Sequence, residues 1–192
     1  MTSLEAVAVL FILANVWLMV KENIWGWPAG IAGVILYAVV NYRAHLYSNA
    51  GLQIVYLILS IHGWYEWLHG GAGRSELQIT RASRRVWLYC SLAGVAGTFV
   101  LLGFLRLTTD AAFPIWDAST TSFSLVAQWM LNEKITENWL WWLVIDIVYV
   151  PIYIFGKLPL TAALYALFCV LSVKGYVDWK RSVRPGAAAV VA

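Results

Sequence analysis

The sequence predicts an all-α integral membrane protein of seven transmembrane helices, arranged as two parallel three-helix repeats joined by a linker helix. Three observations predict this fold class. Of the 192 residues, 61% are hydrophobic and only 12% are charged, against about a quarter in a soluble domain. Seven apolar runs have the length that crosses a bilayer. Motifs at the ends of the first three runs also return, in order, in the last three.

The seven spans are expected near residues 4–20, 25–47, 52–68, 86–105, 113–131, 138–156 and 159–179. Each run approaches the roughly 20 mainly apolar residues that a helix needs to cross the hydrocarbon core. Most connections are short, which suits neighbouring helices joined by hairpin turns. Only residues 69–85 are long enough for a substantial loop. The 12 Trp and 10 Tyr residues fit a protein anchored at two membrane interfaces.

An internal repeat relates the first three spans to the last three. ENIWGW at 22–27 resembles ENWLWW at 137–142, and GWYEW at 63–67 resembles GYVDW at 175–179. The sequence offsets of these two matches differ by three, which predicts one short insertion or deletion. An odd linker helix lets both triplets enter the membrane in the same direction, and in parallel-repeat transporters the substrate site lies near the midplane between the repeats. The alternative is a chance match between aromatic-rich segments.

This plan divides the chain into four segments: a first repeat at 1–68, a cytoplasmic loop plus linker helix at 69–112, a second repeat at 113–180 and a cytoplasmic tail at 181–192. Most Lys and Arg residues fall on one side of the membrane, and the other side holds only Arg43, Arg106 and Lys157. The positive-inside rule therefore places the N-terminus outside and the C-terminus in the cytoplasm. The first run follows no basic segment, so it is expected to be a retained span and not a cleaved signal.

Several function classes are disfavoured by the sequence. The net charge of +3 is spread along the connections, so nucleic acid is not an expected partner. Cys90 and Cys169 lie in apolar runs without metal or redox spacing and are expected to be packing residues. The sequence has no metal motif, no Walker loop and no hydrolase motif. We therefore expect no cofactor, no metal and no enzymatic activity, and a solute transporter is favoured over a hidden membrane enzyme or a sensor subunit.

Polar residues inside the spans recur at helical spacing and predict an internal cavity. The fifth span carries such a stripe from Asp117, and the sixth carries one around Asp146. Polar groups in hydrocarbon face the bundle interior or a water-filled cavity, and polar stripes with aromatic edges suit a small, partly aromatic solute. The candidate substrate-binding residues are Asn41, Gln53, Tyr56, Trp64, Trp116, Asp117, Thr121, Gln128, Trp142, Asp146, Tyr149 and Tyr165.

Asp146 is the most informative candidate because it lies about 12 Å inside the sixth span, near the bilayer centre. An isolated carboxylate there costs several kcal/mol or becomes protonated, so a partner is expected. The available partners are water, hydroxyl and amide groups, or a cationic substrate. The alternative is a protonated or water-bridged packing residue. For Trp142, Tyr149 and Tyr165 the alternative is core packing, and for Asp117 it is a helix cap.

Three motifs resemble the PnuC family of vitamin transporters. LYSNAGLQIVYLILSIHGWYEW at 46–67 looks like the family's LYxxxxLQ…GWYxW signature, DAAFPIWD at 110–117 its AFPxWD element, and ENWLWWLVID at 137–146 its ENWxxWxxxN/D element. The likeness extends in order over about residues 20–180. It implies a SWEET-like three-plus-one-plus-three fold, a homotrimer and a bacterial inner membrane location. It also implies uptake of nicotinamide riboside, an NAD precursor, by facilitated diffusion with trapping by a cytoplasmic kinase.

The resemblance leaves two cationic substrates open. Nicotinamide riboside transporters of this family can have Asn where this chain has Asp146, and similar relatives are thought to carry thiamine or other vitamins. A buried carboxylate favours either cation, and aromatic faces add cation–π attraction of about 2 kcal/mol when water is excluded. Amides such as Asn41, Gln53 and Gln128 suit a ribose diol, which favours the riboside. A membrane sensor that binds without transport is the second alternative.

Overall fold

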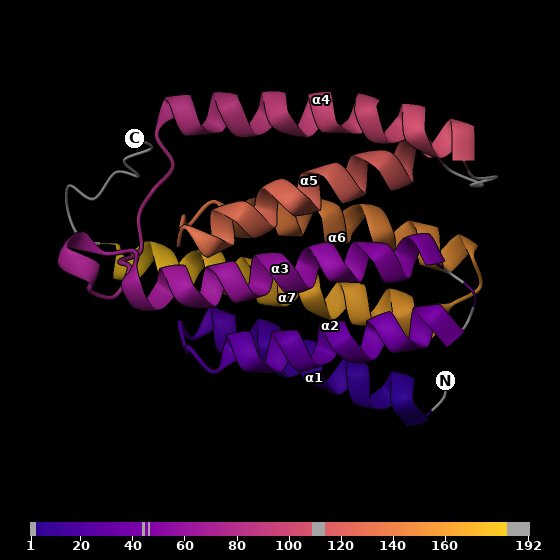
Figure 1. Cartoon of the computed structure of the whole chain (residues 1–192), viewed down its shortest axis with the longest axis horizontal. Coiled ribbons are helices and arrows are strands. Elements are labelled where there is room, and N and C mark those ends of the chain that lie inside the picture. The colour runs from indigo at the N-terminus through magenta and orange to yellow at the C-terminus, as the bar shows by residue number, and fades with distance from the viewer. Residues whose placement is uncertain (1–2, 44, 46, 109–113, 184–192) are drawn as a thin grey trace. The chain divides into compact units, whose positions relative to one another are not determined.

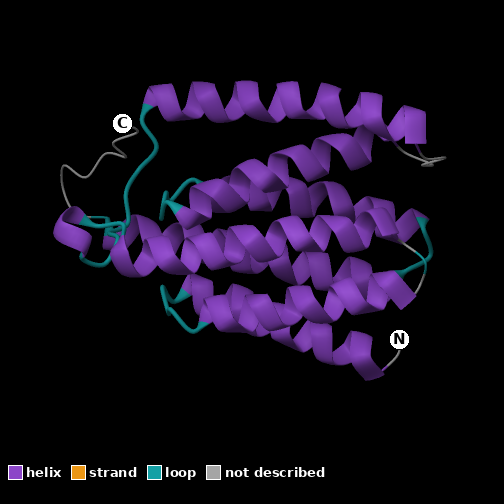
Figure 2. Cartoon of the chain, in the orientation of Figure 1, coloured by secondary structure: helices purple, strands orange, loops and turns teal. Residues whose placement is uncertain are grey.

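The computed structural model describes residues 3–43, 45, 47–108 and 114–183 of the chain. Within these residues the helices are joined by loops and turns, and there is no β-strand (Figures 1 and 2). The elements are α1 (Ser3–Val20), α2 (Gly26–Arg43), α3 (Tyr47–His69), the short 3₁₀ helix η1 (Ala72–Arg74), α4 (Arg84–Thr108), α5 (Pro114–Asn132), α6 (Asn138–Phe155) and α7 (Pro159–Ser182). Each predicted span is confirmed as a helix. The largest difference is at the start of α3, which begins at Tyr47, five residues before the expected start at 52; α2 ends at Arg43, four residues before its expected end. Residues 109–113, which include the first four residues of the DAAFPIWD motif, and most of the predicted tail lie outside the described residues.

Four of these helices, α1, α4, α6 and α7, are long and apolar enough to cross a membrane by length and composition. The other three are 18, 23 and 19 residues long but less apolar. Glycines interrupt α2, and amide, hydroxyl and carboxyl groups interrupt α3 and α5. Small and polar residues in membrane helices mark helix packing and polar interiors, so these helices have the composition expected of interior spans.

Local sequence explains where several helices begin. Pro114 and Pro159 are the first residues of α5 and α7, where the missing N–H of proline sacrifices no helical hydrogen bond. At the start of α4, the Val86 backbone N–H donates to Ser83 Oγ at 3.3 Å, the usual N-cap bond. These starts are therefore encoded within one turn of sequence.

The chain forms two compact units. The first is Met1–Gln78 with Asn132–Lys134, and the second is Ile79–Leu131 with Ile135–Ala192. In the first unit α2 packs against α1 and α3, and in the second α6 packs against α7. The boundaries of the four segments expected from the sequence stay predictions.

A pair of perpendicular tryptophans recurs in both units. Trp27 and Trp67 meet edge to face with ring centroids 5.4 Å apart, and Trp139 and Trp179 meet in the same way at 5.6 Å. All four rings are almost fully buried. Trp27 therefore corresponds to Trp139. The match of ENIWGW with ENWLWW had instead paired Trp27 with Trp142. One constant offset relates both members of the first pair to those of the second, so the expected three-residue slip is wrong.

The backbone repeats at the same offset as the tryptophans. Glu22 and Lys134 have positive φ angles of 56° and 49°, and His45 and Lys157 have angles of 60° and 57°. Each residue lies just beyond a helix, where a left-handed conformation ends the helix and bonds its last carbonyls. The repeat is thus one of helix ends and turn geometry, which the residue types at these positions do not show.

The turn after α5 holds a buried lysine within the first unit. Lys134 Nζ donates to the Leu77 carbonyl oxygen at 2.8 Å and lies 4.4 Å from the centroid of the Trp67 ring. Burial lowers the pKa of the Lys134 ammonium, and the charges of Glu22 and Glu76 act in the opposite direction. The cation–π contact and the hydrogen bond compensate the buried charge, so this turn is held to the loop that follows α3.

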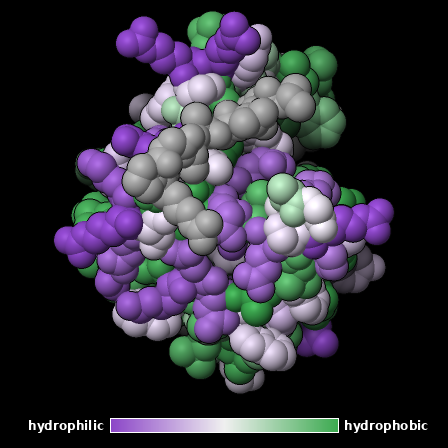
Figure 3. Space-filling model, turned by 90° about the vertical axis from the view of Figure 1, so that its left-hand side faces the viewer, coloured by the Kyte–Doolittle hydropathy of each residue, from purple (hydrophilic) through white to green (hydrophobic). Residues whose placement is uncertain are grey.

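The end of the loop that follows α3 is also bound by residues of the turn between α5 and α6, within the second unit. Glu137 is 4% exposed, and its Oε2 accepts a hydrogen bond from the Ala82 backbone N–H at 2.7 Å. Its Oε1 lies 3.5 Å from Arg81 Nε. The Thr136 backbone and hydroxyl both donate to the Thr80 carbonyl oxygen at 3.0 Å. Figure 3 looks onto the end of the molecule where this loop lies, and hydrophilic residues are prominent there.

Candidate substrate site

The centre of the candidate site is Asp146, in the third turn of α6. Its side chain is buried, with the residue 5% exposed. Ser172 Oγ, from the neighbouring helix α7, donates a hydrogen bond to Asp146 Oδ2 at 3.3 Å. No Lys, Arg or His side chain in the described part of the chain forms an ion pair with Asp146. A buried carboxylate with one hydroxyl partner is poorly compensated, so the site is suited to a cationic group.

Aromatic rings from the same two helices lie next to Asp146 along the helices, toward the C-terminal end of α6 and the N-terminal end of α7. Tyr165 contacts Tyr149 at 4.8 Å and Tyr153 at 5.0 Å between ring centroids. Tyr149 and Tyr153 stack at 5.7 Å, and Phe168 meets Tyr165 edge to face at 5.7 Å. Such a cluster offers π faces to a planar cation and hydroxyl groups that give and accept hydrogen bonds.

Helix α5 positions one ring of this cluster. The Tyr149 hydroxyl donates to Thr120 Oγ1 at 2.9 Å, and Thr120 Oγ1 donates in turn to the Trp116 carbonyl oxygen at 2.7 Å. Thr120 is buried, so this relay fixes Tyr149 from a neighbouring helix. Thr120 thus acts as a positioning residue for the ring.

We expect Tyr149→Phe to weaken substrate binding by a factor of roughly 3 to 10, because a net hydrogen bond contributes about 0.5–1.5 kcal/mol to the ring's position. Thr120→Val removes the same hydrogen bond by removing its acceptor. If the bond is the cause, binding isotherms of the two single variants and the double variant show non-additive losses. Fully additive losses would contradict a role for this relay.

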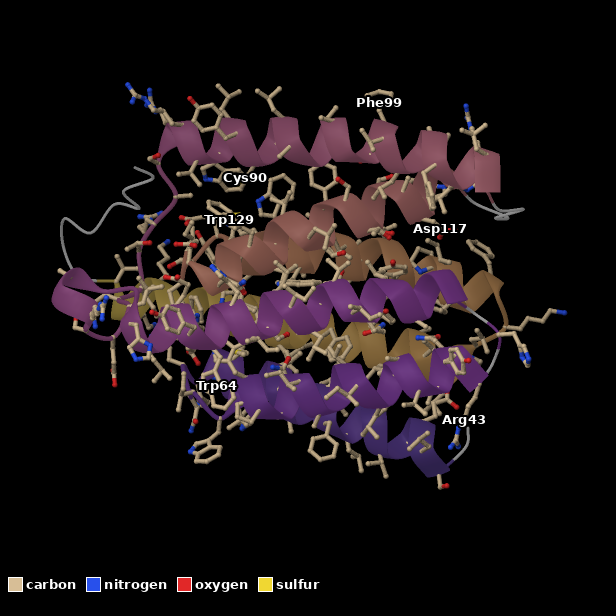
Figure 4. The ribbon with its side chains drawn as sticks, in the orientation of Figure 1. Arg43, Trp64, Cys90, Phe99, Asp117 and Trp129 are labelled. Carbon is tan, nitrogen blue, oxygen red and sulfur yellow. The ribbon has the colours of Figure 1, made fainter. Side chains whose placement is uncertain are left out.

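The structure separates the predicted site residues into the two units. Asp146, Tyr149 and Tyr165 come together on α6 and α7. Thr121 and Trp142 are half-buried, and Gln128 is buried. Trp116 is 52% exposed, and Asp117 is exposed at the first turn of α5 (Figure 4).

The remaining predicted residues belong to the first unit. Asn41, Gln53 and Tyr56 are half-buried, whereas Trp64 is 37% exposed. The buried tryptophan of α3 is Trp67, which packs on Trp27. The place of the four predicted residues in a substrate site stays a prediction.

Four members of the described cluster were not among the predicted site residues: Thr120, Tyr153, Phe168 and Ser172. Helical spacing gives a signal for three of them, because Tyr153 follows Tyr149 by four residues, and Phe168 and Ser172 continue the face of Tyr165. Thr120 gives no comparable signal, since its role depends on which face α5 turns to α6. Among the described residues, no group of three His, Cys, Asp or Glu side chains could hold a metal ion.

A family model described as nicotinamide mononucleotide transporter matches residues 2–181 of the chain. The chain belongs to this family. The resemblance to PnuC transporters is thereby confirmed, as is the expectation of a membrane transporter and not an enzyme.

Relatives support the assignment over nearly the whole chain. The nicotinamide riboside transporter PnuC of Escherichia coli (strain K12) is 26% identical over 94% of this chain and 86% of its own length. The riboflavin/roseoflavin transporter RibM of Streptomyces davaonensis is also 26% identical, over 86% of this chain and 80% of its own. A crystal structure of the vitamin B3 transporter PnuC has 28% identity and a TM-score of 0.75, and covers 94% of this chain and 81% of that one. The predicted all-α, seven-helix membrane fold is confirmed.

Proposed function

We propose that this transporter carries nicotinamide riboside, with Asp146 binding the cationic pyridinium ring. The observation that carries the proposal is the buried Asp146 carboxylate, which has one described hydroxyl partner. A ring cation compensates this charge in a low-dielectric environment. The rings of Tyr149 and Tyr165, on the same two helices, supply the stacking faces.

The chemistry of Asp146 separates the substrates that the names of relatives suggest. Riboflavin is a neutral ring system, so it gains no charge pairing from the carboxylate. Nicotinamide mononucleotide carries a phosphate, and the basic residues of the second unit's last two helices give that phosphate no partner beside Asp146. Lys174 pairs with Asp178 at 2.8 Å, and the other basic residues lie at helix ends. Nicotinamide riboside has the cation without the phosphate.

Thiamine is the second candidate, because its thiazolium ring is also a cationic heteroaromatic. The carboxylate and the tyrosine cluster favour both molecules. The hydroxyls of Tyr149, Tyr153 and Tyr165 can bond a ribose diol, which thiamine lacks, and this favours the riboside.

The proposal extends to the mode of transport. The chain acts by facilitated diffusion without ion coupling, as a homotrimer in a bacterial inner membrane, with its N-terminus outside and its C-terminus in the cytoplasm. A cytoplasmic kinase phosphorylates the product and thereby prevents its exit. The positive-inside distribution of Lys and Arg supports this orientation.

Flux through purified protein in liposomes tests the proposal. Vesicles are loaded with buffer and given nicotinamide riboside, thiamine, riboflavin or nicotinamide mononucleotide in turn. We expect riboside to equilibrate in the absence of any ion gradient, and at least tenfold faster than the neutral or phosphorylated compounds. Preferred thiamine flux would assign the second candidate. Binding without flux would show a sensor, and either outcome would overturn the riboside proposal.

A further inference from the structure

A groove of about 410 Å³ runs between α4 and α5, both of which belong to the second unit. Its α4 wall follows one helical face, and its α5 wall lies opposite. Cys90 and Trp129 face each other across it, whereas Phe99 points away from it (Figure 4). The lining residues are Val86, Tyr89, Cys90, Ala93, Gly97, Ser122, Leu125, Val126 and Trp129.

The serine that lines the groove already has a hydrogen-bond partner within the protein. Ser122 Oγ donates to the Gly94 carbonyl oxygen at 2.8 Å, so its hydrogen-bonding capacity is used within the protein. The rest of the lining is almost wholly apolar, and apolar grooves take apolar occupants. Because α4 is long and apolar enough to span a membrane, a groove that follows this helix would run parallel to lipid tails.

The length of the groove matches one leaflet of a bilayer. From Val86 to Gly97 the α4 wall extends about 17 Å at ~1.5 Å per residue, against roughly 15 Å for half of a ~30 Å hydrocarbon core. The groove begins next to the N-terminal end of α4, where Arg84 and Arg85 are the first helical residues. Both arginines are exposed, and neither forms an ion pair with another described residue.

We propose that this groove holds one acyl chain of an anionic phospholipid, whose phosphate is bound by Arg84 and Arg85. Arginine forks match phosphate oxygens in a bidentate manner. Tyr89 and Trp129, near the same end, have the amphipathic rings that favour the headgroup level. The groove is apolar, has the length of one leaflet and ends at two exposed arginines. These features fit a lipid better than a protein surface, because a protein partner would not supply a phosphate to the two arginines.

Native mass spectrometry of the purified full chain tests the proposal, with phosphatidylglycerol and phosphatidylcholine of identical acyl chains as probes. We expect one retained phosphatidylglycerol per chain. Ala93→Phe fills the groove and should remove this adduct, whereas Ala96→Phe, on the exposed face of α4 outside the groove, should keep it. The double change Arg84→Gln and Arg85→Gln should lower the preference for phosphatidylglycerol roughly 30-fold. Arg181→Gln, at the end of α7, serves as the charge control.

Three results would overturn the assignment. The first is an unchanged phosphatidylglycerol adduct in Ala93→Phe. The second is equal retention of the two lipids by the unmodified chain. The third is a change in subunit number in Ala93→Phe with lipid adducts intact, which would make the groove an interface between copies. Size-exclusion profiles check that each variant is folded, and the arginine variants test the headgroup independently of the groove filling.

Discussion

Replacing Asp146 by alanine is expected to abolish measurable uptake while the protein still reaches the membrane. Removing one partner of a buried charge interaction costs about 2 kcal/mol or more, which is at least roughly a 30-fold loss of affinity. Ser172 Oγ also loses its acceptor. Uptake of labelled substrate into cells, with surface expression measured in parallel, checks the result.

Two further variants separate charge from packing. Asp146→Asn keeps the size of the side chain and an oxygen that accepts from Ser172, so any loss in this variant comes from the charge. Asp178→Asn removes a carboxylate that pairs with Lys174 on α7, away from the candidate site, and should leave uptake near its original level. Wild-type affinity in Asp146→Ala at normal expression would refute the proposed site.

The second large effect is on stability, and it concerns the glycines beneath the paired tryptophans. A Cβ at Gly63 would lie 2.2 Å from the Trp27 ring, and a Cβ at Gly175 would lie 2.5 Å from the Trp139 ring. Both distances are far inside van der Waals contact. Gly63→Ala and Gly175→Ala are therefore each expected to lower the free energy of unfolding by about 1–3 kcal/mol or more.

Thermal unfolding in detergent measures this effect, at about 2–4 °C per kcal/mol for a chain of this size. The chain offers matched controls, since a Cβ at Gly51 or Gly103 meets nothing within 4 Å. Gly51→Ala and Gly103→Ala should be neutral or slightly stabilising, because alanine favours a helix over glycine. Equal melting temperatures for all four variants would contradict this prediction, because they would show that the tryptophan rings move aside without loss of stability.

The repeat illustrates how far residue types alone can lead. Matching letters aligned ENIWGW with ENWLWW and required a slip of three residues. In the structure, Trp27 and Trp139 occupy equivalent positions over Gly63 and Gly175. The motif match was misleading because the repeated feature is a contact between helices. Such a contact constrains two positions that are far apart in the sequence, and it does not constrain a short continuous motif.

The candidate site shows the same division. Asp146 stands out in the sequence because a carboxylate in the middle of an apolar span is costly wherever the helix points. Its partner Ser172 and the relay from Tyr149 to Thr120 depend on the rotation of α5, α6 and α7 about their axes. The same rotation explains why two tryptophans of one motif differ: Trp67 is buried, whereas Trp64 is exposed.

The sequence by itself determined the membrane location, the seven helices, their approximate ends and the place of Asp146 in the middle of an apolar helix. It could do so because hydrocarbon forces each crossing segment to satisfy its own backbone, so length and hydropathy suffice. Only the tertiary structure decided the constant offset between the two repeats, the tyrosine cluster around Tyr165 and the groove between α4 and α5. These features arise from which helix faces meet, and side-chain packing between helices selects those faces after the spans have formed.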